Sequence, residues 1–168
     1  MKIRKFQPGD EMSLLDVFHA AVHGIASQDY TAEQIQAWAP AAMDRELWIK
    51  RMRGIQPFVV ESEGRTVAYA DVQADGYIDH FFVSPAVART GVGTLLMGRL
   101  HEVARAQGIA VLTSDVSRTA QPFFARFGFV VVEQRLPIVR DVVVPNARMR
   151  CELAAGSSFE PGHPSRSD

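Results

Sequence analysis

Hydrophobic positions in the first third of the chain follow the spacing of helices. Apolar side chains recur every three or four positions between residues 11 and 26, which predicts an amphipathic helix. Thr31, with Gln34 three residues later, forms a capping box that starts a second helix. This helix must end before Pro40, because the residue before a proline avoids the helical conformation. A third helical pattern covers residues 44–53.

The pattern then changes to that of strands alternating with helices. Two runs, FVVES and RTVAYADV, flank Glu63–Gly64 and predict a hairpin, and a turn at ADGY leads into a third strand, YIDHFFV. A helix closed by Gly108 follows, then the strand IAVLTSDV and a helix ending at Gly128. The last two predicted strands are FVVVEQ and DVVVPNARMRCEL.

Together with a short strand at residues 2–6, these elements predict a mixed α/β fold with the order β-α-α-α-β-β-β-α-β-α-β-β. The first half is expected to be antiparallel and the second half to contain a βαβ-like unit. We expect one domain over residues 1–153. The Ser-, Gly- and Pro-rich residues 154–168 are expected to form a flexible tail.

Composition excludes several classes of protein. The net charge of -1, without a basic block, argues against binding to nucleic acid or to a membrane surface. Cys151 is the single cysteine, so no intrachain disulfide can form. No apolar stretch reaches the ~18 residues of a membrane span. Polar residues interrupt the N-terminal segment, so no signal peptide is predicted and we expect a cytoplasmic protein.

The segment VARTGVGTLL, residues 87–96, places two glycines between a predicted strand and a helix. Backbone amides at such a helix start can bind an anion, and glycines let a phosphate approach without a Cβ in the way. Leu96 stands where the dinucleotide-binding fingerprint needs a third glycine, and no Gly-Lys-Ser/Thr follows as in a P-loop. A sharp turn against the sheet would also account for the spacing, so this segment leaves both interpretations open.

Two longer segments resemble the GNAT superfamily of N-acetyltransferases. IDHFFVSPAVARTGVGTLLMGRL is similar to its acyl-CoA-binding motif at Val83, Pro85, Gly91 and Gly93. AQPFFARFGFV resembles its Ala-x-x-Phe-Tyr-x-x-x-Gly-Phe segment. The resemblance implies the GNAT fold, a mostly antiparallel sheet splayed around its cofactor with flanking helices, and acetyl-CoA as co-substrate.

The resemblance also implies where acetyl-CoA binds: its pyrophosphate on the amides of residues 89–94, and its pantetheine arm along the strand at residues 81–83. Ala88 departs from the family's Arg or Gln, Ser117 from its Asn, and Phe124 from the Tyr that protonates the departing thiolate. Arg89 can supply the missing charge, and Ser117 either contacts the pantetheine or caps a helix. The expected cofactor-binding residues are Phe81, Phe82, Val83, Arg89, Thr90, Gly91, Val92, Gly93, Thr94, Ser117 and Phe124.

An amine acceptor must lose a proton before it attacks a thioester, so the reaction needs a base. Asp79 and His80 on the predicted strand are the candidates, and Asp115 is a weaker third. Strand alternation predicts that Asp79 shares a face with residues 81 and 83, whereas Ile78 and His80 face the other way. A structural role for Asp79 and His80, as hydrogen-bonded residues of the sheet, is the alternative.

The segment HGIASQDY is expected to shape the acceptor site, because the first two helices do so in the family. We expect His23, Asp29 and Tyr30 to bind the acceptor, and Tyr30 is also the candidate acid that replaces the missing tyrosine. Asp29 supporting its turn, and Tyr30 packing against the second helix, are the alternatives. His19 and His23 lie four residues apart but lack a third ligand, so no metal site is predicted.

The expected function is transfer of an acetyl group from acetyl-CoA to a primary amine of a small molecule or peptide, by direct attack in a ternary complex. Because Phe124 replaces the family's tyrosine, the alternative function is that of a non-catalytic regulator that binds acyl-CoA. An interaction domain without cofactor is disfavoured by the intact Gly91 and Gly93. The protein is expected to act as a monomer or a homodimer.

Overall fold

The computed structural model describes residues 1–154, and the predicted tail beyond Ala154 lies outside this range. The helices are α1 (Glu11–Gly24), α2 (Ala32–Trp38), α3 (Arg45–Ile55), α4 (Val92–Ala106) and α5 (Gln121–Arg126), with 3-10 turns η1 (Ala26–Gln28) and η2 (Pro85–Val87). The strands are β1 (Lys2–Lys5), β2 (Phe58–Ser62), β3 (Arg65–Ala70), β4 (Tyr77–Ile78), β5 (Phe81–Val83), β6 (Val111–Ser117), β7 (Val130–Arg135), β8 (Ile138–Val139), β9 (Val142–Val143) and β10 (Asn146–Glu152).

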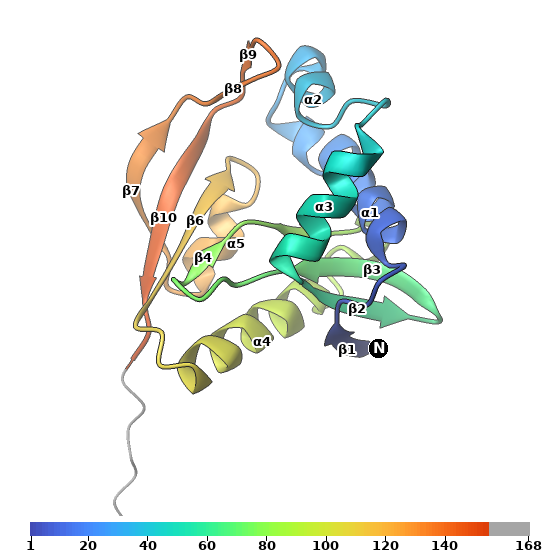
Figure 1. Ribbon diagram of the computed structural model, residues 1–168. Helices are drawn as coiled ribbons and strands as arrows, with labels where there is room; N and C mark the ends of the chain where they lie inside the picture. The colour runs from blue at the N-terminus through green and yellow to red at the C-terminus, as the bar shows by residue number, and fades with distance from the viewer. Residues whose placement is uncertain (155–168) are drawn as a thin grey trace, which may run out of the picture.

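The strands form two four-stranded sheets and a small hairpin (Figure 1). One sheet has the order β1-β2-β3-β5 and is antiparallel throughout. The other has the order β4-β6-β10-β7, and its only parallel pair is β4 with β6. Helix α4 packs on one face of the first sheet, and α1 packs on the opposite face. The predicted mixed α/β fold with a splayed, mostly antiparallel sheet is confirmed.

Local capping signals set the helix boundaries as predicted. The Thr31 side chain accepts a bond from the Gln34 amide, and the Gln34 side chain accepts one from the Thr31 amide. Asp44 caps α3 in the same way through the Leu47 amide. Gly108 follows α4 with a φ of +72°, a left-handed conformation that favours glycine.

Three sequence predictions differ from the structure. The strand expected over residues 77–83 is interrupted and becomes β4 and β5. The strand expected over residues 141–153 is β9 followed by β10, and β9 pairs with the unpredicted β8 across a two-residue turn. The helix expected to begin at about Ser117 or Thr119 is α5, which starts at Gln121 because residues 117–120 form a hydrogen-bonded turn before it.

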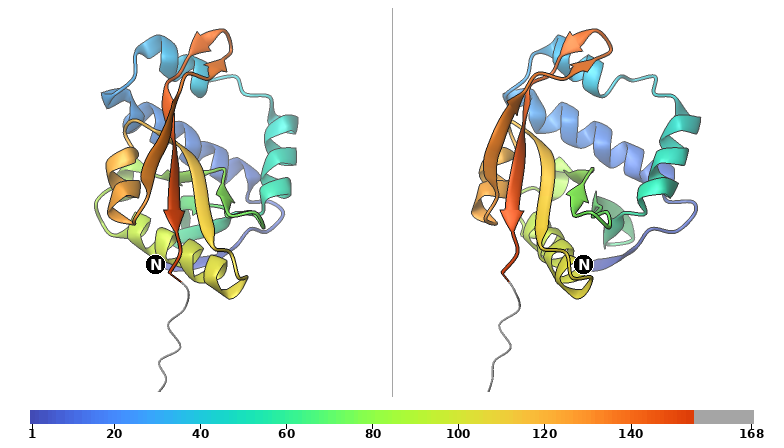
Figure 2. Two further views of the ribbon diagram at one scale, coloured as in Figure 1. Left: turned by 90° about the vertical axis from the view of Figure 1, so that its left-hand side faces the viewer. Right: turned by 60° about the vertical axis from the view of Figure 1, so that its left-hand side comes forward.

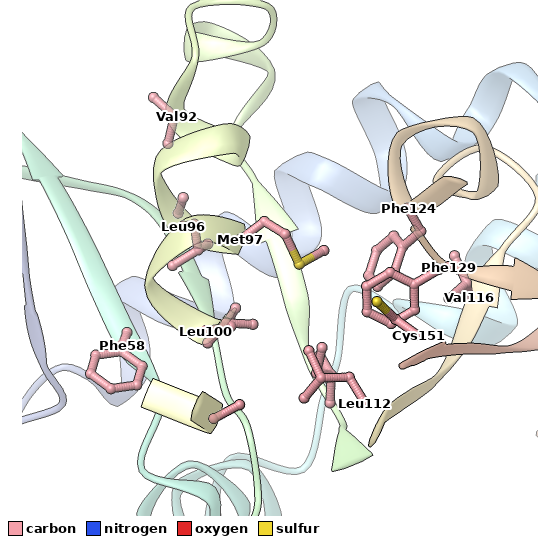
Figure 3. Close-up of a cluster of buried hydrophobic side chains, with 14 of the residues drawn as sticks. Phe58, Val92, Leu96, Met97, Leu100, Leu112, Val116, Phe124, Phe129 and Cys151 are labelled. Atoms are coloured by element: carbon pink, nitrogen blue, oxygen red, sulfur yellow. The ribbon is translucent and has the colours of Figure 1, made fainter. Parts of the chain in front are cut away.

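Buried side chains of α4 belong to a hydrophobic cluster shared with strands of both sheets (Figure 3). Val92, Leu96, Met97 and Leu100 of α4 are each at most 1% exposed. Burial of such a side chain contributes about 1.5–3 kcal/mol to stability. Phe124 and Phe129 extend the same cluster towards the second sheet. This packing fixes the N-terminus of α4, which carries the glycine segment, relative to β5.

Candidate active site

The two sheets separate at Asp79 and His80. Tyr77 and Ile78 pair with Thr113 and Ser114 of β6, and the Ser114 hydroxyl donates a 2.8 Å bond to the Ile78 carbonyl. After His80 the chain joins the other sheet as β5, which pairs with β3 alone. A gap therefore opens between β5 and β6 beyond Ile78. Figure 2 shows the second sheet, with β6, β10 and β7 side by side.

The buried carboxylate of Asp71 binds the backbone where the strand is interrupted between β4 and β5. Oδ1 of Asp71 accepts bonds from the amides of Asp79, at 3.1 Å, and His80, at 2.6 Å. Oδ2 of Asp71 accepts a 2.6 Å bond from the Gln73 side chain, and the Asp71 amide donates to the His80 carbonyl. Asp71 thus provides the hydrogen bonds that a sheet partner would otherwise supply here. Sequence reasoning missed this residue, since a single Asp after a strand carries no specific signal.

The interruption overturns the predicted alternation of side chains. Ile78 and Phe81 both pack in the core cluster beside α4, although they are three residues apart. The His80 ring lies on the opposite side with Phe82, their centroids 5.5 Å apart. The chain therefore accommodates one extra residue between Ile78 and Phe81, as in a β-bulge. Asp79 does not share the face of Phe81, and His80 does not share the face of Ile78.

Strand β5 presents free backbone groups to the gap. Phe82 lies opposite Tyr69, and Ser84 donates a backbone bond to the Val67 carbonyl across the same ladder. In an antiparallel pair, hydrogen-bonded and non-hydrogen-bonded positions alternate. The amides and carbonyls of Phe81 and Val83 therefore point away from β3 and into the gap.

A first cavity of about 460 Å³ lies where β5, the glycine segment and α5 meet. Gly91 begins α4 with a φ of +87°, which any other L-residue would adopt only with strain. A Cβ on Gly93 would lie 3.1 Å from two carbons of the Phe123 ring, on the wall of this cavity. The first amides of a helix have no partner within it and can bind an anion. Arg89 and Arg126 add positive charge to the lining.

Most of the expected cofactor-binding residues line this first cavity. They are Phe81, Phe82, Val83, Arg89, Gly91, Gly93, Thr94, Ser117 and Phe124. Thr90 and Val92 contribute no side chain to it: the Thr90 hydroxyl donates to the Val87 carbonyl, and Val92 is buried in the core. The Ser117 hydroxyl also accepts a 3.3 Å bond from the Ala120 amide, so it lines the cavity and caps the following turn.

A second cavity of about 390 Å³ lies on the other side of β5. Its walls include Asp79, His80 and several aromatic rings. Trp38, Phe82 and Ser117 line both cavities, so the two meet at these residues. A ligand reaching along the first cavity would end beside the second. The arrangement suits a transfer between two bound molecules.

Comparison with known proteins decides the family. The protein-family model described as "Acetyltransferase (GNAT) domain" matches residues 26–153 of this chain. The chain belongs to the GNAT acetyltransferase family. It is 35% identical over 150 residues to YafP of Escherichia coli (strain K12), described as an uncharacterized N-acetyltransferase, covering 89% of this chain and 95% of YafP.

Solved structures of GNAT proteins have the same fold. A GCN5-related N-acetyltransferase from Rhodopseudomonas palustris superposes with a TM-score of 0.86 at 30% identity, covering 90% of this chain and 95% of the other. YncA from Salmonella typhimurium, solved with its cofactor acetyl-CoA, has a TM-score of 0.64 at 18% identity and covers 99% and 98%. As a member of the GNAT family the chain is an acyltransferase that uses acetyl-CoA as its co-substrate.

The acidic candidates for a catalytic base in this GNAT protein are both paired with arginine. Asp79 accepts bonds of 3.0 and 2.9 Å from one Arg51 nitrogen. Asp115 accepts bonds of 3.0 and 3.2 Å from Arg148, and Arg135 lies 4.0 Å away. Neither carboxylate is therefore free to take a proton without breaking an ion pair.

His80 has different surroundings. Its Nδ1 lies 3.0 Å from the buried Tyr69 hydroxyl, and its Nε2 lies 3.9 Å from Asp79. Burial lowers the pKa of the His80 imidazole to about 4, and the nearby Asp79 charge opposes that shift. The ring is consequently neutral at physiological pH, and it lines the second cavity.

The three residues expected to bind the acceptor are placed differently. Tyr30 lines the second cavity, but its hydroxyl donates to the Pro145 carbonyl and accepts a 2.9 Å bond from the Arg118 amide. Burial also raises the pKa of Tyr30. His23 and Asp29 are exposed and line neither cavity, and the His23 ring bonds the Ala39 carbonyl. The structure therefore does not bring His23 and Asp29 to the site.

Several lining residues were missed by sequence reasoning. Trp38 and Trp48 are not among the predicted site residues, and both line the second cavity. Within residues 1–154 no three His, Cys, Asp or Glu side chains are grouped to hold a metal ion. The same part of the chain contains no helix with the length and apolar character of a membrane span.

Asp71 is expected to make stability depend on pH. Burial raises its pKa from 3.8 to about 6, so the folded state favours the protonated form. Its contribution is complete below about pH 4 and is lost as the pH rises through about 6. Between pH 4 and 7, wild type should lose on the order of 3 kcal/mol of unfolding free energy relative to Asp71→Asn.

Urea unfolding at a series of pH values measures this difference. The lowered pKa of His80 acts in the opposite sense, but it is present in both proteins and cancels. Asp16→Asn, at an exposed position of α1, is the matched control and should run parallel to wild type. A constant difference between wild type and Asp71→Asn across this range would contradict the assignment.

Proposed function

We propose that this protein transfers the acetyl group of acetyl-CoA directly to a primary amine of a small molecule or peptide held in the second cavity. The observation that carries the proposal is the meeting of the two cavities at Trp38, Phe82 and Ser117. An amine in the second cavity would reach the end of a molecule bound in the first without a covalent acetyl-enzyme.

The residues of the first cavity fit acetyl-CoA. The amides that open α4, with Arg89 and Arg126 nearby, suit the negative charge of a pyrophosphate. The free backbone groups of Phe81 and Val83 can pair with the amide groups of a pantetheine arm. When bound, acetyl-CoA supplies a thioester that an amine can attack. An amide of β5 facing the gap is then a suitable donor for the thioester oxygen.

His80 is the proposed general base. With its proton on Nδ1 donated to the Tyr69 hydroxyl, Nε2 is left as an acceptor for the proton of the amine. Asp79 lies close enough to stabilise the resulting imidazolium, and Arg51 holds Asp79 in position. Asp79 therefore acts as a positioning residue in this proposal, instead of the base that the strand pattern favoured.

Neither Phe124 nor Tyr30 offers a free hydroxyl in place of the family's tyrosine. Phe124 is buried against Phe81 and Phe129, and the Tyr30 hydroxyl is held by two backbone groups. A thiol has a reference pKa of about 8.5, so near neutral pH it can depart as a thiolate. We therefore propose that the thiolate leaves without a protein acid.

Release of CoA in the presence of a panel of primary amines tests the proposed function. Acetyl-CoA alone should be stable, and at least one amine should produce CoA and an equal amount of acetylated product, measured by thiol titration and mass spectrometry. Binding of acetyl-CoA without release across the panel would instead favour the non-catalytic regulator.

A further inference from the structure

The second cavity is lined by two arginines, Arg51 and Arg140, and by two carboxylates, Asp79 and Asp115. Both of its carboxylates, Asp79 and Asp115, are already paired with arginines. Arg140 lines the same cavity, and its guanidinium donates to the Ala37 carbonyl at 2.7 Å and approaches the Met43 sulfur at 3.9 Å. Throughout the described residues 1–154, no carboxylate lies within ion-pair distance of Arg140. Because Asp79 pairs with Arg51 and Asp115 pairs with Arg148 from outside the lining, Arg140 is the lining charge that these carboxylates leave uncompensated.

The hairpin of β8 and β9 holds Arg140 in this place. Val139 pairs with Val142, so Arg140 and Asp141 alone form the turn, with φ values of +45° and +65°. Such turns favour Asn-Gly, since other residues adopt positive φ with strain. The hairpin is tied to α2 by the Arg140 bond to Ala37 and by a 3.0 Å bond from Gln34 to the Val143 carbonyl. A residue type that is unfavourable at positive φ is thus kept where its exposed side chain lines the second cavity.

Aromatic side chains make up much of the rest of the second cavity, beside the polar residues His80, Ser117 and Asn146. Its aromatic walls are Phe18, Tyr30, Trp38, Trp48 and Phe82. Phe82 meets Phe18 edge-on with ring centroids 5.0 Å apart, and Trp48 packs against Phe18 at 5.2 Å. A cavity of this size and character holds a small apolar ligand whose orientation is set by a few polar groups.

We infer that the acceptor is a small apolar amine that also carries a carboxylate, as an aromatic α-amino acid does, and that Arg140 binds the carboxylate. The inference rests on the proposed function, because the reacting amine must lie beside His80, whose ring packs against Phe82 of the wall that the two cavities share. Charge-assisted bonds from Arg suit a carboxylate, and the aromatic walls suit an apolar side chain. Arg140 would then be a specificity-determining residue.

The test compares L-phenylalanine with L-phenylalanine amide, which keeps the amine and the ring but lacks the charge. The amide also mimics the N-terminus of a peptide, and its amine is the less basic of the two. In wild type, kcat/KM should be about tenfold or more higher for phenylalanine. Calorimetry without acetyl-CoA should show tighter binding of phenylalanine by a similar factor.

Arg140→Asn is the decisive variant, because asparagine accepts the positive φ of the turn and removes the charge. It should lose the preference for phenylalanine in both measurements, because its use of phenylalanine should fall far more than its use of the amide. Arg140→Lys should recover part of the preference. Arg65→Met, which removes an exposed arginine of β3, is the control and should behave as wild type.

Each outcome decides between the two proposals. Equal or better use of the amide by wild type would overturn this inference, point to a peptide acceptor and leave the proposed function standing. Arg140-dependent binding of phenylalanine without CoA release would support the carboxylate site and contradict the proposed function. Failure of phenylalanine to bind, or binding that Arg140→Asn does not change, would overturn the inference.

Discussion

Replacing Gly93 with valine is expected to abolish the thermal stabilisation by acetyl-CoA. Bound ligand at a hundredfold excess over Kd should raise the melting temperature of wild type by roughly 5–10 °C. At Gly93 a Cβ already approaches Phe123 within 3.1 Å, and the valine methyl groups would extend into the first cavity. The variant should melt cooperatively and show no shift. Differential scanning fluorimetry with and without acetyl-CoA measures it.

Gly98 provides the matched control on the same helix. It is exposed, and a Cβ there would meet nothing within 4 Å. Gly98→Val should therefore keep the full acetyl-CoA shift. A folded Gly93→Val protein that kept the wild-type shift would show that the glycine segment does not bind the co-substrate.

Replacing His80 with glutamine is expected to lower kcat by about a hundredfold or more, the usual contribution of a general base. Glutamine preserves a polar group near the Tyr69 hydroxyl but cannot take the proton of the amine. Affinity for acetyl-CoA should change little, because His80 lines the second cavity and not the first. Steady-state kinetics on the best amine, with the acetyl-CoA thermal shift in parallel, measures both.

Two further variants make this result specific. His101→Gln changes a half-buried histidine of α4 outside both cavities and should leave kcat near wild type. Asp79→Asn should reduce kcat less than His80→Gln, since Asp79 acts through His80. A larger loss of kcat in Asp79→Asn than in His80→Gln would indicate that the Asp79 carboxylate is the base.

The pH profile adds an independent check. Because burial keeps the pKa of His80 near 4, the base is neutral throughout the usual assay range. The rise of kcat/KM with pH should therefore follow the pKa of the amine acceptor and move when an amine of different basicity is used. A rise of kcat/KM that occurs at the same pH for every amine and disappears in His80→Gln would contradict the lowered pKa of His80.

Sequence patterns predicted the features that depend on neighbouring residues. The capping box of Thr31 and Gln34 and the hairpin at Glu63–Gly64 each follow from a few adjacent positions, and both formed as expected. The glycine segment also lies at the start of α4, on the wall of the first cavity. The spacing of its glycines follows from local requirements, namely the positive φ of Gly91 and the close approach of Gly93 to the Phe123 ring.

The features that sequence reasoning missed depend on distant residues. The interruption at Asp79–His80 is held by Asp71, eight and nine residues earlier, and Arg51 reaches Asp79 from α3. Strand periodicity carries no trace of these bonds, so the side chains were assigned to the wrong faces. The β8–β9 hairpin was missed because its turn, Arg140–Asp141, lacks the usual glycine.

The residues of the acceptor site were also difficult to predict, because they come together from distant parts of the sequence. The prediction of His23 and Asp29 rests on the segment HGIASQDY, residues 23–30, and the structure leaves both residues exposed outside both cavities. The rings of Trp38 and Trp48 reach the second cavity from the adjacent helices α2 and α3. Only tertiary packing distinguishes such residues from ordinary core residues.

Direct transfer between the two cavities is tested most sharply by two-substrate kinetics. Initial rates should be measured over a grid of acetyl-CoA and amine concentrations, with mass spectrometry of the protein after incubation with acetyl-CoA alone. Attack within a ternary complex predicts double-reciprocal lines that intersect, and a protein mass without an added acetyl group. Parallel lines together with a stoichiometrically acetylated protein would contradict the account.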